Sequence, residues 1–574
     1  MKRFLFALTA IFVFTAASCS MLGNEVEDPS GTMITSTKQK NVITNGIRTV
    51  DVDGNTMFGS GGCMLQVGKY FYWYGEHRYG NGNAIGVSCY RSTDLVNWEW
   101  RCDIVDENID PQLNPVFIER PKVIYNAKTN KYVMWAHREG VGWNYGMAEF
   151  IVAVGDAPDE PFEFVKSGRP FDDPKFNVHD NGYTADYSED TSNYENMPYG
   201  FMSRDCTLFV DDDGTAYFAS SYRENTQMHI YRLTEDYLDI DTTYWPTDDV
   251  LHVNQREAPC LFKKDGVYYM VCSGTDGWNI TPSNYQYAYD IQGPWSGVYD
   301  FGDTDGSGNS GKLDHADRSQ PAYVFELKAT DGSGNSTFMY MGDKWGPAFG
   351  GSSTYDSQFV WSVIEFNSPT DLYTAYSEAL VPDVEKGTIG YPQYYYIQNK
   401  YGHYLTQATN VQAGQVASWS NTVTTTDNSS TKYRDPYLYQ WRFVPTATGY
   451  QIVNRWSGLA ITASSDESLT AMTLNGRSDE NKYQIWKLNS LQSPYYSIQN
   501  VNNNYYLSTI VFTTHQTFEQ VNGVNALWLT SWGYRVGWTS STLGEANKRA
   551  NDIIPRQSWR FIPVSTSDNM SMVN

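Results

Sequence analysis

The sequence predicts an all-β protein with two successive domains, each built from its own set of strand repeats. One unit recurs five times in the first two thirds of the 574 residues, and a different unit recurs three times in the last third. Aromatic residues make up 15% of the chain and charged residues only 18%, a balance typical of short strands packed through aromatic side chains. A chain of this length also exceeds one ordinary hydrophobic core.

The formal net charge of −24 argues against nucleic acid and anionic membrane surfaces as partners, because a phosphate backbone requires clustered lysine and arginine. Most of the acidity is explained by the solubility of a large exported protein. The six cysteines that follow Cys19 have neither CxxC pairs nor the Cys/His spacing of zinc sites. We expect most of them to be small buried residues.

The N-terminus predicts export and a lipid anchor. Lys2 and Arg3 precede an apolar run over residues 4–17, which has the length of a signal peptide and is too short for a membrane span. Residues 1–18 resemble a bacterial lipoprotein signal peptide, which implies that Cys19 becomes the lipidated N-terminus and residues 19–45 a polar tether. We therefore expect a monomer in the bacterial cell envelope, held to the membrane only by its lipid. Ordinary secretion is the alternative.

The repeat in the first two thirds has the form of a propeller blade. Each copy contains an apolar strand, a turn and a returning strand rich in Tyr and Phe, and more strand-like sequence follows. The copies begin at Gly61, Glu119, Arg204, Arg256 and Arg318. Units of about fifty residues with about four strands each are typical of propeller blades, so we predict a five-bladed β-propeller over residues 46–382. The strands of a β-sandwich, the alternative, would not restart five times on one motif.

The repeat also predicts a single active site. The first strand of each blade lines the central channel, so the residues that begin the five copies should meet at one funnel: residues 59–61, Glu119, Asp205, Glu257 and Gln320. Glycoside hydrolysis needs a carboxylic acid that protonates the leaving oxygen and, in an inverting enzyme, a base about 6.5–9.5 Å away. Each carboxylate has an arginine beside it, so a structural ion pair is the alternative for any one of them. Their recurrence at equivalent positions favours catalysis.

Residues 46–382 resemble glycoside hydrolase family 43, and within it the exo-β-1,3-galactanase group. The resemblance rests on motifs that are weak singly and specific together and in order. They are Gly59-Ser-Gly-Gly-Cys-Met-Leu, Tyr72-Trp-Tyr-Gly-Glu76, Ser92-Thr-Asp-Leu-Val-Asn-Trp98, Glu119-Arg-Pro-Lys-Val-Ile-Tyr-Asn126, Arg204-Asp-Cys-Thr-Leu-Phe-Val, Glu257-Ala-Pro, Ser273-Gly-Thr-Asp-Gly-Trp278 and Ser319-Gln320.

The resemblance implies a role for each funnel residue. Glu257 would be the general acid, and Asp205 would orient it and raise its pKa by like-charge proximity. Glu119 would hydrogen-bond substrate hydroxyls or position water. Most family members carry an Asp base on the first blade, where this chain has Gly-Ser-Gly at residues 59–61. The galactanase-like group shares this departure, which implies that the amide of Gln320 takes part in activating water. Glu119 as the base, with Gln320 only binding substrate, is the alternative.

Three aromatic residues are candidate substrate-binding residues. Trp278 and Trp345 are placed to stack under a galactose ring, and Tyr74 is the third candidate. The resemblance implies no required cofactor, and it leaves open a structural calcium ion in the channel. Asp314, His315 and Asp317 lie beside the fifth repeat, but their spacing is not diagnostic of a metal site, and no metal ligand is predicted.

The last third, residues 388–566, is predicted to form a β-trefoil. Its three copies begin at Tyr394, Tyr450 and Tyr495, and each closes on a Gln and Trp at residues 440–441, 484–486 and 557–559. Three copies with this ending resemble the ricin-type β-trefoil of carbohydrate-binding module family 13. Whether the domain binds sugar or serves only as a packing partner stays open.

Together the resemblances imply an inverting exo-β-1,3-galactanase that releases galactose from the β-1,3-galactan backbone of plant arabinogalactan. A second hypothesis keeps the fold and changes the substrate to arabinofuranosides, xylosides or galactofuranosides. A third is a non-catalytic, surface glycan-binding lipoprotein. The missing first-blade base favours this third hypothesis, whereas the presence of Glu257, Asp205 and Glu119 opposes it.

Overall fold

The computed structural model describes residues 42–564 except 80–81, 114, 142–144, 179–198, 223–224, 226, 251–254, 280, 302–318 and 350 in the first part of the chain, and 401, 403, 407–414, 417, 421–435, 464–472, 476, 479–480, 492–493, 505, 511–534 and 539–556 in the second. Two short paired strands, β1 (Val26–Glu27) and β2 (Met33–Ile34), precede them. Cys19 lies outside the described residues, as do Asp314, His315 and Asp317.

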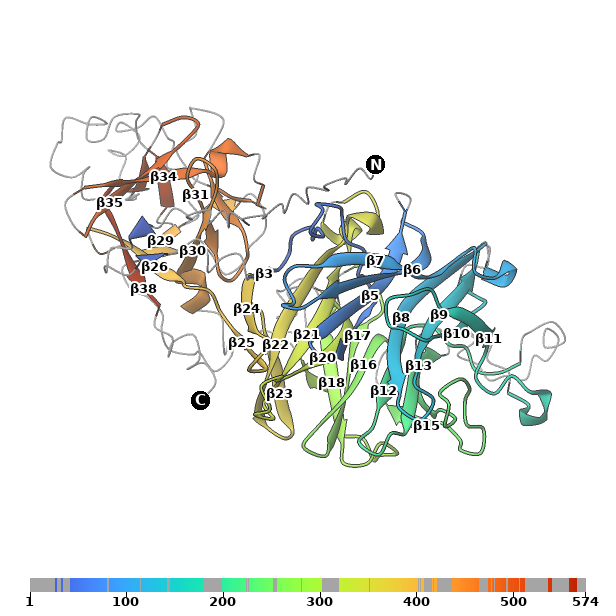
Figure 1. The fold of residues 1–574 in the computed structure, drawn as a ribbon. Coiled ribbons are helices and arrows are strands. Elements are labelled where there is room, and N and C mark those ends of the chain that lie inside the picture. The colour runs from blue at the N-terminus through green and yellow to red at the C-terminus, as the bar shows by residue number, and fades with distance from the viewer. Residues whose placement is uncertain are drawn as a thin grey trace, which may run out of the picture.

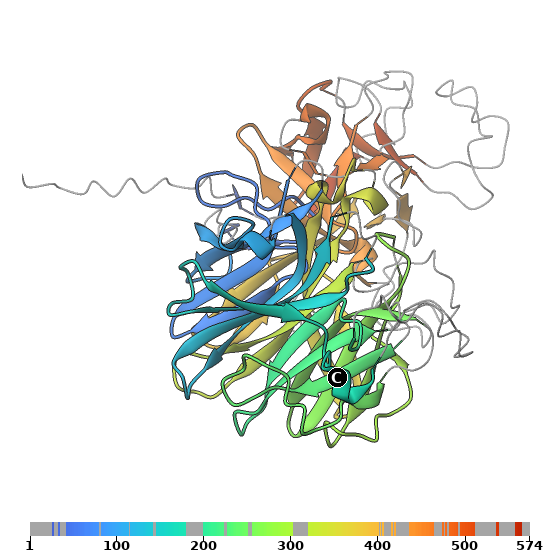
Figure 2. The same cartoon turned by 90° about the vertical axis from the view of Figure 1, so that its right-hand side faces the viewer.

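Five four-stranded antiparallel sheets follow one another along the chain (Figures 1 and 2). Their strands are β4 (Cys63–Val67), β5 (Tyr70–Arg78), β6 (Ala84–Ser92) and β7 (Glu99–Asp106); β8 (Val116–Asn126), β9 (Lys131–Gly140), β10 (Glu149–Gly155) and β11 (Glu163–Gly168); β12 (Cys206–Val210), β13 (Ala216–Tyr222), β14 (Gln227–Arg232) and β15 (Thr247–Val250); β16 (Arg256–Lys264), β17 (Val267–Gly274), β18 (Ser283–Ala288) and β19 (Tyr299–Asp300); and β20 (Gln320–Lys328), β21 (Ser336–Lys344), β22 (Gln358–Ser368) and β23 (Asp371–Ala375). Short 3-10 helices η2 (Pro111–Leu113), η3 (Pro174–Phe176), η5 (Gly346–Phe349) and η6 (Thr354–Asp356) lie in the connections.

The first strand of each sheet lies in the centre of this region. Strands β4, β8, β12, β16 and β20 contact one another in a closed ring, in that order. The turns that follow the inner strands contain the residues that tight hairpins require. Between β16 and β17, for instance, Asp265 and Gly266 form a two-residue turn with φ of 50° and 82°, the left-handed conformation that Asp and Gly tolerate. The predicted all-β propeller arrangement is therefore confirmed.

The number of sheets differs from the prediction of five blades. A sixth sheet has three strands in the order β25 (Thr388–Gly390), β24 (Ala379–Asp383) and β3 (Ile43–Thr44). It pairs the start of the described chain with residues that follow the fifth repeat, so Ile43 lies opposite Leu380. Its strands are short and belong to no repeat, and counting repeats therefore missed it.

The C-terminal part is a separate sheet system of thirteen strands (Figure 1). The strands are β26 (Tyr395–Asn399), β27 (Tyr404–Thr406), β28 (Gln415–Val416), β29 (Ser418–Ser420), β30 (Gln440–Pro445), β31 (Tyr450–Asn454), β32 (Ala460–Thr462), β33 (Thr473–Asn475), β34 (Trp486–Ser490), β35 (Tyr496–Asn500), β36 (Leu507–Ile510), β37 (Arg535–Trp538) and β38 (Trp559–Pro563), with 3-10 helices η7 (Pro436–Tyr439) and η8 (Lys482–Gln484).

Its three closing tryptophans share one environment. Trp441, Trp486 and Trp559 are fully buried in one core, and each indole N–H donates to the carbonyl of a leucine or isoleucine in its own repeat, at 3.1, 3.0 and 2.9 Å. The three repeats therefore place equivalent tryptophans in one shared hydrophobic core, as the sequence predicts.

The six cysteines from Cys63 to Cys272 are free in the structure, and five of them are buried. This confirms the expectation that most serve as small core residues. Among the described residues, no helix is long and apolar enough to span a membrane.

Candidate active site

A pocket of about 370 Å³ takes residues from the strands or connecting loops of all five four-stranded sheets. All four predicted catalytic residues line it: Glu119, Asp205, Glu257 and Gln320. They come from blades that are far apart in sequence, and the common start of the repeats is what brings them together. The pocket also contains Trp278 and Trp345.

Unusual backbone at the pocket floor places two of the carboxylates. Arg120 and Ala258, the residues after Glu119 and Glu257, have φ of 54° and 56°, and Gly61 has φ of 62° in the equivalent region of the first sheet. Non-glycine residues rarely adopt this left-handed conformation. The pairing register shifts directly after Glu119 and Glu257, so each inner strand bulges where its acid faces the funnel.

Glu257 is buried, and each of its carboxylate oxygens accepts a hydrogen bond. Its Oε1 accepts a hydrogen bond from Gln320 Nε2 at 2.7 Å, and its Oε2 accepts one from Asn225 Nδ2 at 3.0 Å. Burial, and then the charge of Asp205, raise the pKa of Glu257 to about 8. A carboxyl group with this pKa is protonated at neutral pH, which is the state that a general acid requires.

Asp205 is held beside the acid by backbone and by arginine. Its Oδ2 accepts from the N–H of Ala258 at 3.0 Å, so it fixes the residue that follows Glu257. The same oxygen lies 3.0 Å from Arg120 Nη2. Asp205 therefore remains close to Glu257 while its own charge is balanced by the guanidinium group.

Gln320 has a fixed amide orientation. Its Oε1 accepts hydrogen bonds from Trp345 Nε1 at 2.7 Å and from Arg120 Nη2, and its Nε2 donates to Glu257 and, at 3.1 Å, to Ser273 Oγ. The two N–H donors at the oxygen oppose an imidic O–H there. Because the amide contacts the acid directly, water activation by Gln320 requires that a bound substrate first separates the two side chains.

Glu119 lies on a different side of the pocket among aromatic and basic groups. Tyr145 donates its hydroxyl hydrogen to Glu119 Oε1 at 3.3 Å, and Arg78 Nη2 lies 3.5 Å from the same oxygen. Burial raises the pKa of Glu119, and the Arg78 charge opposes this shift. The loose contacts leave this carboxylate able to accept hydrogen bonds from sugar hydroxyls or from a water molecule.

A buried network that sequence reasoning missed supports these side chains. Arg120 Nη1 donates to Pro321 O at 2.9 Å, and Arg120 N donates to Glu76 Oε1 at 2.9 Å. Asp343 Oδ2 accepts from Gly61 N at 2.7 Å, and burial raises the pKa of Asp343 to about 7. Glu76 and Arg120 stood in the motifs that carry the family resemblance, which was the one sequence signal available for them.

The aromatic predictions have different outcomes. Trp278 is half-buried at the pocket wall, so part of its ring faces the open space. Trp345 is only 3% exposed, and its indole N–H orients Gln320, so its main role is to hold the amide. Tyr74 is wrong as a substrate-binding residue. Its side chain is fully buried in the core between the first two sheets and donates to Pro158 O at 2.7 Å.

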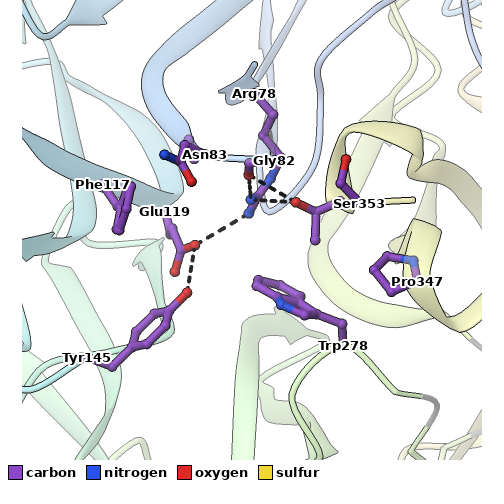
Figure 3. A pocket seen from close by; sticks show the side chains of 11 residues that line it. Arg78, Gly82, Asn83, Phe117, Glu119, Tyr145, Trp278, Pro347 and Ser353 are labelled. Carbon is purple, nitrogen blue, oxygen red and sulfur yellow. Dashed lines mark hydrogen bonds and ion pairs between the residues drawn. The ribbon is translucent and has the colours of Figure 1, made fainter. Parts of the chain in front are cut away.

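A second pocket of about 280 Å³ adjoins the first and shares Glu119, Tyr145 and Trp278 with it (Figure 3). Figure 3 shows the Glu119 carboxylate between Tyr145 and Arg78, with the Trp278 ring across the opening. The remaining lining residues come from the first, second and fifth sheets and their loops: Arg78, Gly82, Asn83, Ala84, Phe117, Pro347, Ser353 and Thr354. The acid Glu257 does not line this pocket.

Among the residues that the structure describes, the groups beneath the site do not suit a calcium ion. Calcium binds six to eight oxygen ligands, usually carboxylates and carbonyls. Here the amine of Lys122 donates to the carbonyls of Gly61 and Arg120, and the thiols of Cys63, Cys206 and Cys260 surround it. Across the described ranges, no group of three or more His, Cys, Asp or Glu side chains is arranged to hold a metal.

Comparison with known proteins decides the family. Residues 58–300 match the family model for glycosyl hydrolases family 43, and residues 438–521 match that for the ricin-type beta-trefoil lectin domain-like family. An exo-beta-1,3-galactanase from Clostridium thermocellum has a solved structure that is 33% identical, with 91% of this chain and 100% of that chain covered and a TM-score of 0.55. The chain belongs to glycoside hydrolase family 43.

The family 43 hydrolase also shares its fold with an exo-beta-1,3-galactanase from Phanerochaete chrysosporium, which is 22% identical over 91% of this chain and 93% of that chain, with a TM-score of 0.52. None of the curated proteins compared with the chain matches it. The predicted family, the glycosidase activity and the ricin-type C-terminal domain are thus confirmed.

Proposed function

We propose that this family 43 hydrolase is an exo-β-1,3-galactanase that releases galactose from the β-1,3-galactan backbone of arabinogalactan by an inverting mechanism. The observation that carries the proposal is a buried Glu257 with a pKa of about 8, which shares one pocket with Asp205, Glu119 and Gln320. The similar enzyme from Clostridium thermocellum is described as an exo-beta-1,3-galactanase, which supports the choice of substrate.

In the proposed reaction the terminal galactose occupies the larger pocket. Glu257 donates its proton to the departing glycosidic oxygen, and Asp205 keeps that carboxyl group protonated until the bond breaks. Water attacks the anomeric carbon from the opposite face. The buried site removes bulk water from the acid, so the charges around the reacting sugar act in a poorly screening environment.

Glu119 and Gln320 are the two candidates for activating the water. Glu119 is an ordinary carboxylate base, whereas Gln320 has its oxygen held by two N–H donors. Azide distinguishes them, because this anion attacks the anomeric carbon in place of water and needs no base to remove a proton. Glu119→Ala and Gln320→Ala are therefore assayed with added azide. The variant whose activity azide restores, with a glycosyl azide as product, lacks the base. The other residue then serves to bind substrate.

The second pocket supports a tolerance for substituted galactose. It adjoins the larger pocket through Glu119, Tyr145 and Trp278 and lies away from the acid, so a group placed there is attached elsewhere than at the scissile bond. Replacing Pro347 with Trp should fill this pocket. We expect kcat/KM on branched arabinogalactan to fall while kcat/KM on linear galactan is retained, and an equal loss on both substrates would contradict this assignment.

The proposal includes a lipid anchor at Cys19 and a monomeric protein in the bacterial cell envelope. The support for it is the sequence of residues 1–19, with its basic start, apolar run and cysteine. Detergent phase partitioning of the natural protein and of a Cys19→Ala variant tests the anchor. Partition of both proteins into the aqueous phase would contradict it.

Product analysis tests the activity itself. Purified protein is incubated with debranched β-1,3-galactan and, in parallel, with arabinoxylan and arabinan. Galactose from the galactan alone, first formed as the α-anomer, is the expected result, because inversion converts the β-linkage. Arabinose or xylose would keep the family and refute the substrate. Absence of product from all three would favour the non-catalytic glycan-binding protein, and a Glu257→Gln variant serves as the inactive control.

A further inference from the structure

The side chain of Lys122 is buried below the active site. Lys122 lies on β8 and is only 1% exposed. Its Nζ donates to Gly61 O at 2.6 Å and to Arg120 O at 3.2 Å. It also interacts electrostatically with the thiols of Cys63, Cys206 and Cys260, which lie on three other inner strands or at their ends. These partners place the amine inside the ring of inner strands.

The two carbonyls that accept hydrogen bonds from Lys122 belong to residues with left-handed backbone, which is strained at Arg120 and unstrained at the glycine. Gly61 and Arg120 have φ of 62° and 54°. Their N–H groups donate in turn to Asp343 and Glu76, at 2.7 and 2.9 Å. Each of these residues is therefore held by a carboxylate at its N–H and by Lys122 at its carbonyl, and the lysine joins the first sheet to the second at the floor of the pocket.

Arg120 transmits this constraint to the reacting groups. Its guanidinium group contacts Asp205, Gln320 and the carbonyl of Pro321, so its position sets those of the two side chains that flank Glu257. A left-handed conformation at a non-glycine residue such as Arg120 is strained and persists only where the surroundings enforce it. The hydrogen bond from Lys122 is one of the contacts that enforce it.

We propose that Lys122 is a positioning residue for the hydrolysis, which fixes Arg120 and, through it, Asp205 and Gln320. Its amine occupies the place that a metal ion in the channel would take. The proposal rests on the proposed function in one respect, namely that Glu257 is the acid. The described oxygen atoms that a cation would need at this position, Gly61 O and Arg120 O, already accept hydrogen bonds from the lysine. Burial lowers the pKa of Lys122, and the buried thiols near it oppose this shift.

The test compares three variants of the full-length protein. Lys122→Met removes both the charge and the donors, Lys122→Gln keeps an N–H donor without the charge, and Lys263→Met changes another lysine, on β16, whose partners are Asp211 and Asp212 outside the pocket. Circular dichroism and thermal unfolding establish that each variant is folded. The kinetic constants are then measured across pH on the substrate that the natural protein hydrolyses.

We expect kcat/KM of Lys122→Met to fall about 10²-fold, mostly through kcat, since a displacement of about 1 Å in catalytic groups costs that much. The basic limb of the pH profile should move to higher pH, because the Arg120 charge lowers the pKa of Glu257 and that charge is no longer held in place. Lys122→Gln should lie between Lys122→Met and the natural protein, and Lys263→Met should match the natural protein in both readouts.

A folded Lys122→Met variant with unchanged kcat and pH profile would overturn the proposal. A fall in kcat with an unshifted basic limb would also overturn it, since it would show a general structural role. Should Lys122→Met not fold, Lys122→Gln carries the same two criteria. An inactive natural protein would instead refute the proposed function, so the two failures are distinguishable.

Discussion

At the scale of single residues, the site depends on the different surroundings of two neighbouring acids, Glu257 and Asp205. Glu257 is buried, and the neutral amides of Asn225 and Gln320 donate hydrogen bonds to its two carboxylate oxygens. Asp205 receives a backbone N–H and lies against the Arg120 guanidinium group. Burial and the neighbouring Asp205 charge raise the pKa of Glu257, so Glu257 holds its proton at neutral pH.

The pH dependence of the reaction should report this arrangement. Since the pKa of Glu257 is about 8 and the acid must be protonated, kcat/KM should decline as the pH rises above about 8. Replacing Asp205 with Asn removes the like charge, which lowers the pKa of Glu257 and moves the basic limb to lower pH. Measured pH profiles of the two proteins check this, and a basic limb that stays in place or moves upward would contradict it.

Removing the acid should have an effect that depends on the leaving group. Glu257→Gln should lower kcat on galactan by about 10²–10⁴-fold, the range for loss of general acid catalysis. A dinitrophenyl galactoside needs no proton to depart, so its hydrolysis should fall much less. Parallel kinetics on the two substrates measure the difference. Equal losses would show that Glu257 acts in some other way than by proton donation.

At the scale of the element, the bulges in the inner strands β8 and β16 place the two acids. Regular alternation would point successive side chains to opposite faces of a sheet. The shift in register after Glu119 and after Glu257 interrupts this alternation and turns both acids toward the funnel. Arg120 and Ala258 occupy the left-handed positions that the bulges require. Strain in the inner strands is thus part of how the site is built.

The bulge in β16 predicts opposite effects for two substitutions of one residue. Ala258→Gly suits φ of 56° and should keep activity and stability. Ala258→Val places a β-branched side chain in the left-handed region, which should lower the free energy of unfolding by about 1–3 kcal/mol and reduce kcat by moving Glu257. Denaturant unfolding and kinetics of the pair check the effect. Similar results for Gly and Val would show that the backbone at this point is not constrained.

At the scale of the whole molecule, a buried ion pair joins the propeller to the C-terminal domain. Glu378, beside β24 of the sixth sheet, pairs through both carboxylate oxygens with Arg442 on β30, and it also accepts from the Tyr394 hydroxyl at 3.0 Å. The backbone N–H of Glu378 donates to Arg455 O at 3.1 Å. These contacts show that the C-terminal domain packs against the propeller, and they are independent of whether the C-terminal domain binds sugar.

Breaking this pair should uncouple the two domains. Arg442→Met leaves the buried Glu378 carboxylate without its cation, and we expect a loss of about 3–5 kcal/mol in the free energy of unfolding. Calorimetry should then show the two domains unfolding at separate temperatures. Lys386→Met, which removes an exposed pair with Asp383, should change the stability by less than about 1 kcal/mol. If Arg442→Met lowers the free energy of unfolding by no more than Lys386→Met does, the ion pair contributes little to the interface.

The sequence by itself determined the two sets of repeats, the strand at the start of each repeat and the four acid and amide side chains that meet in one pocket. These follow from short-range patterns, because alternating apolar residues and turn residues specify a hairpin wherever it stands in the chain. Only the tertiary structure decided that Trp345 contacts Gln320, that Tyr74 belongs to the core, and that Arg120 contacts Asp205 while Lys122 donates to Gly61 O. The contacts of Tyr74, Arg120 and Lys122 join different blades, whereas Trp345 and Gln320 lie at the ends of two paired strands of the fifth blade. No local pattern records which side chain a neighbouring strand or sheet will supply.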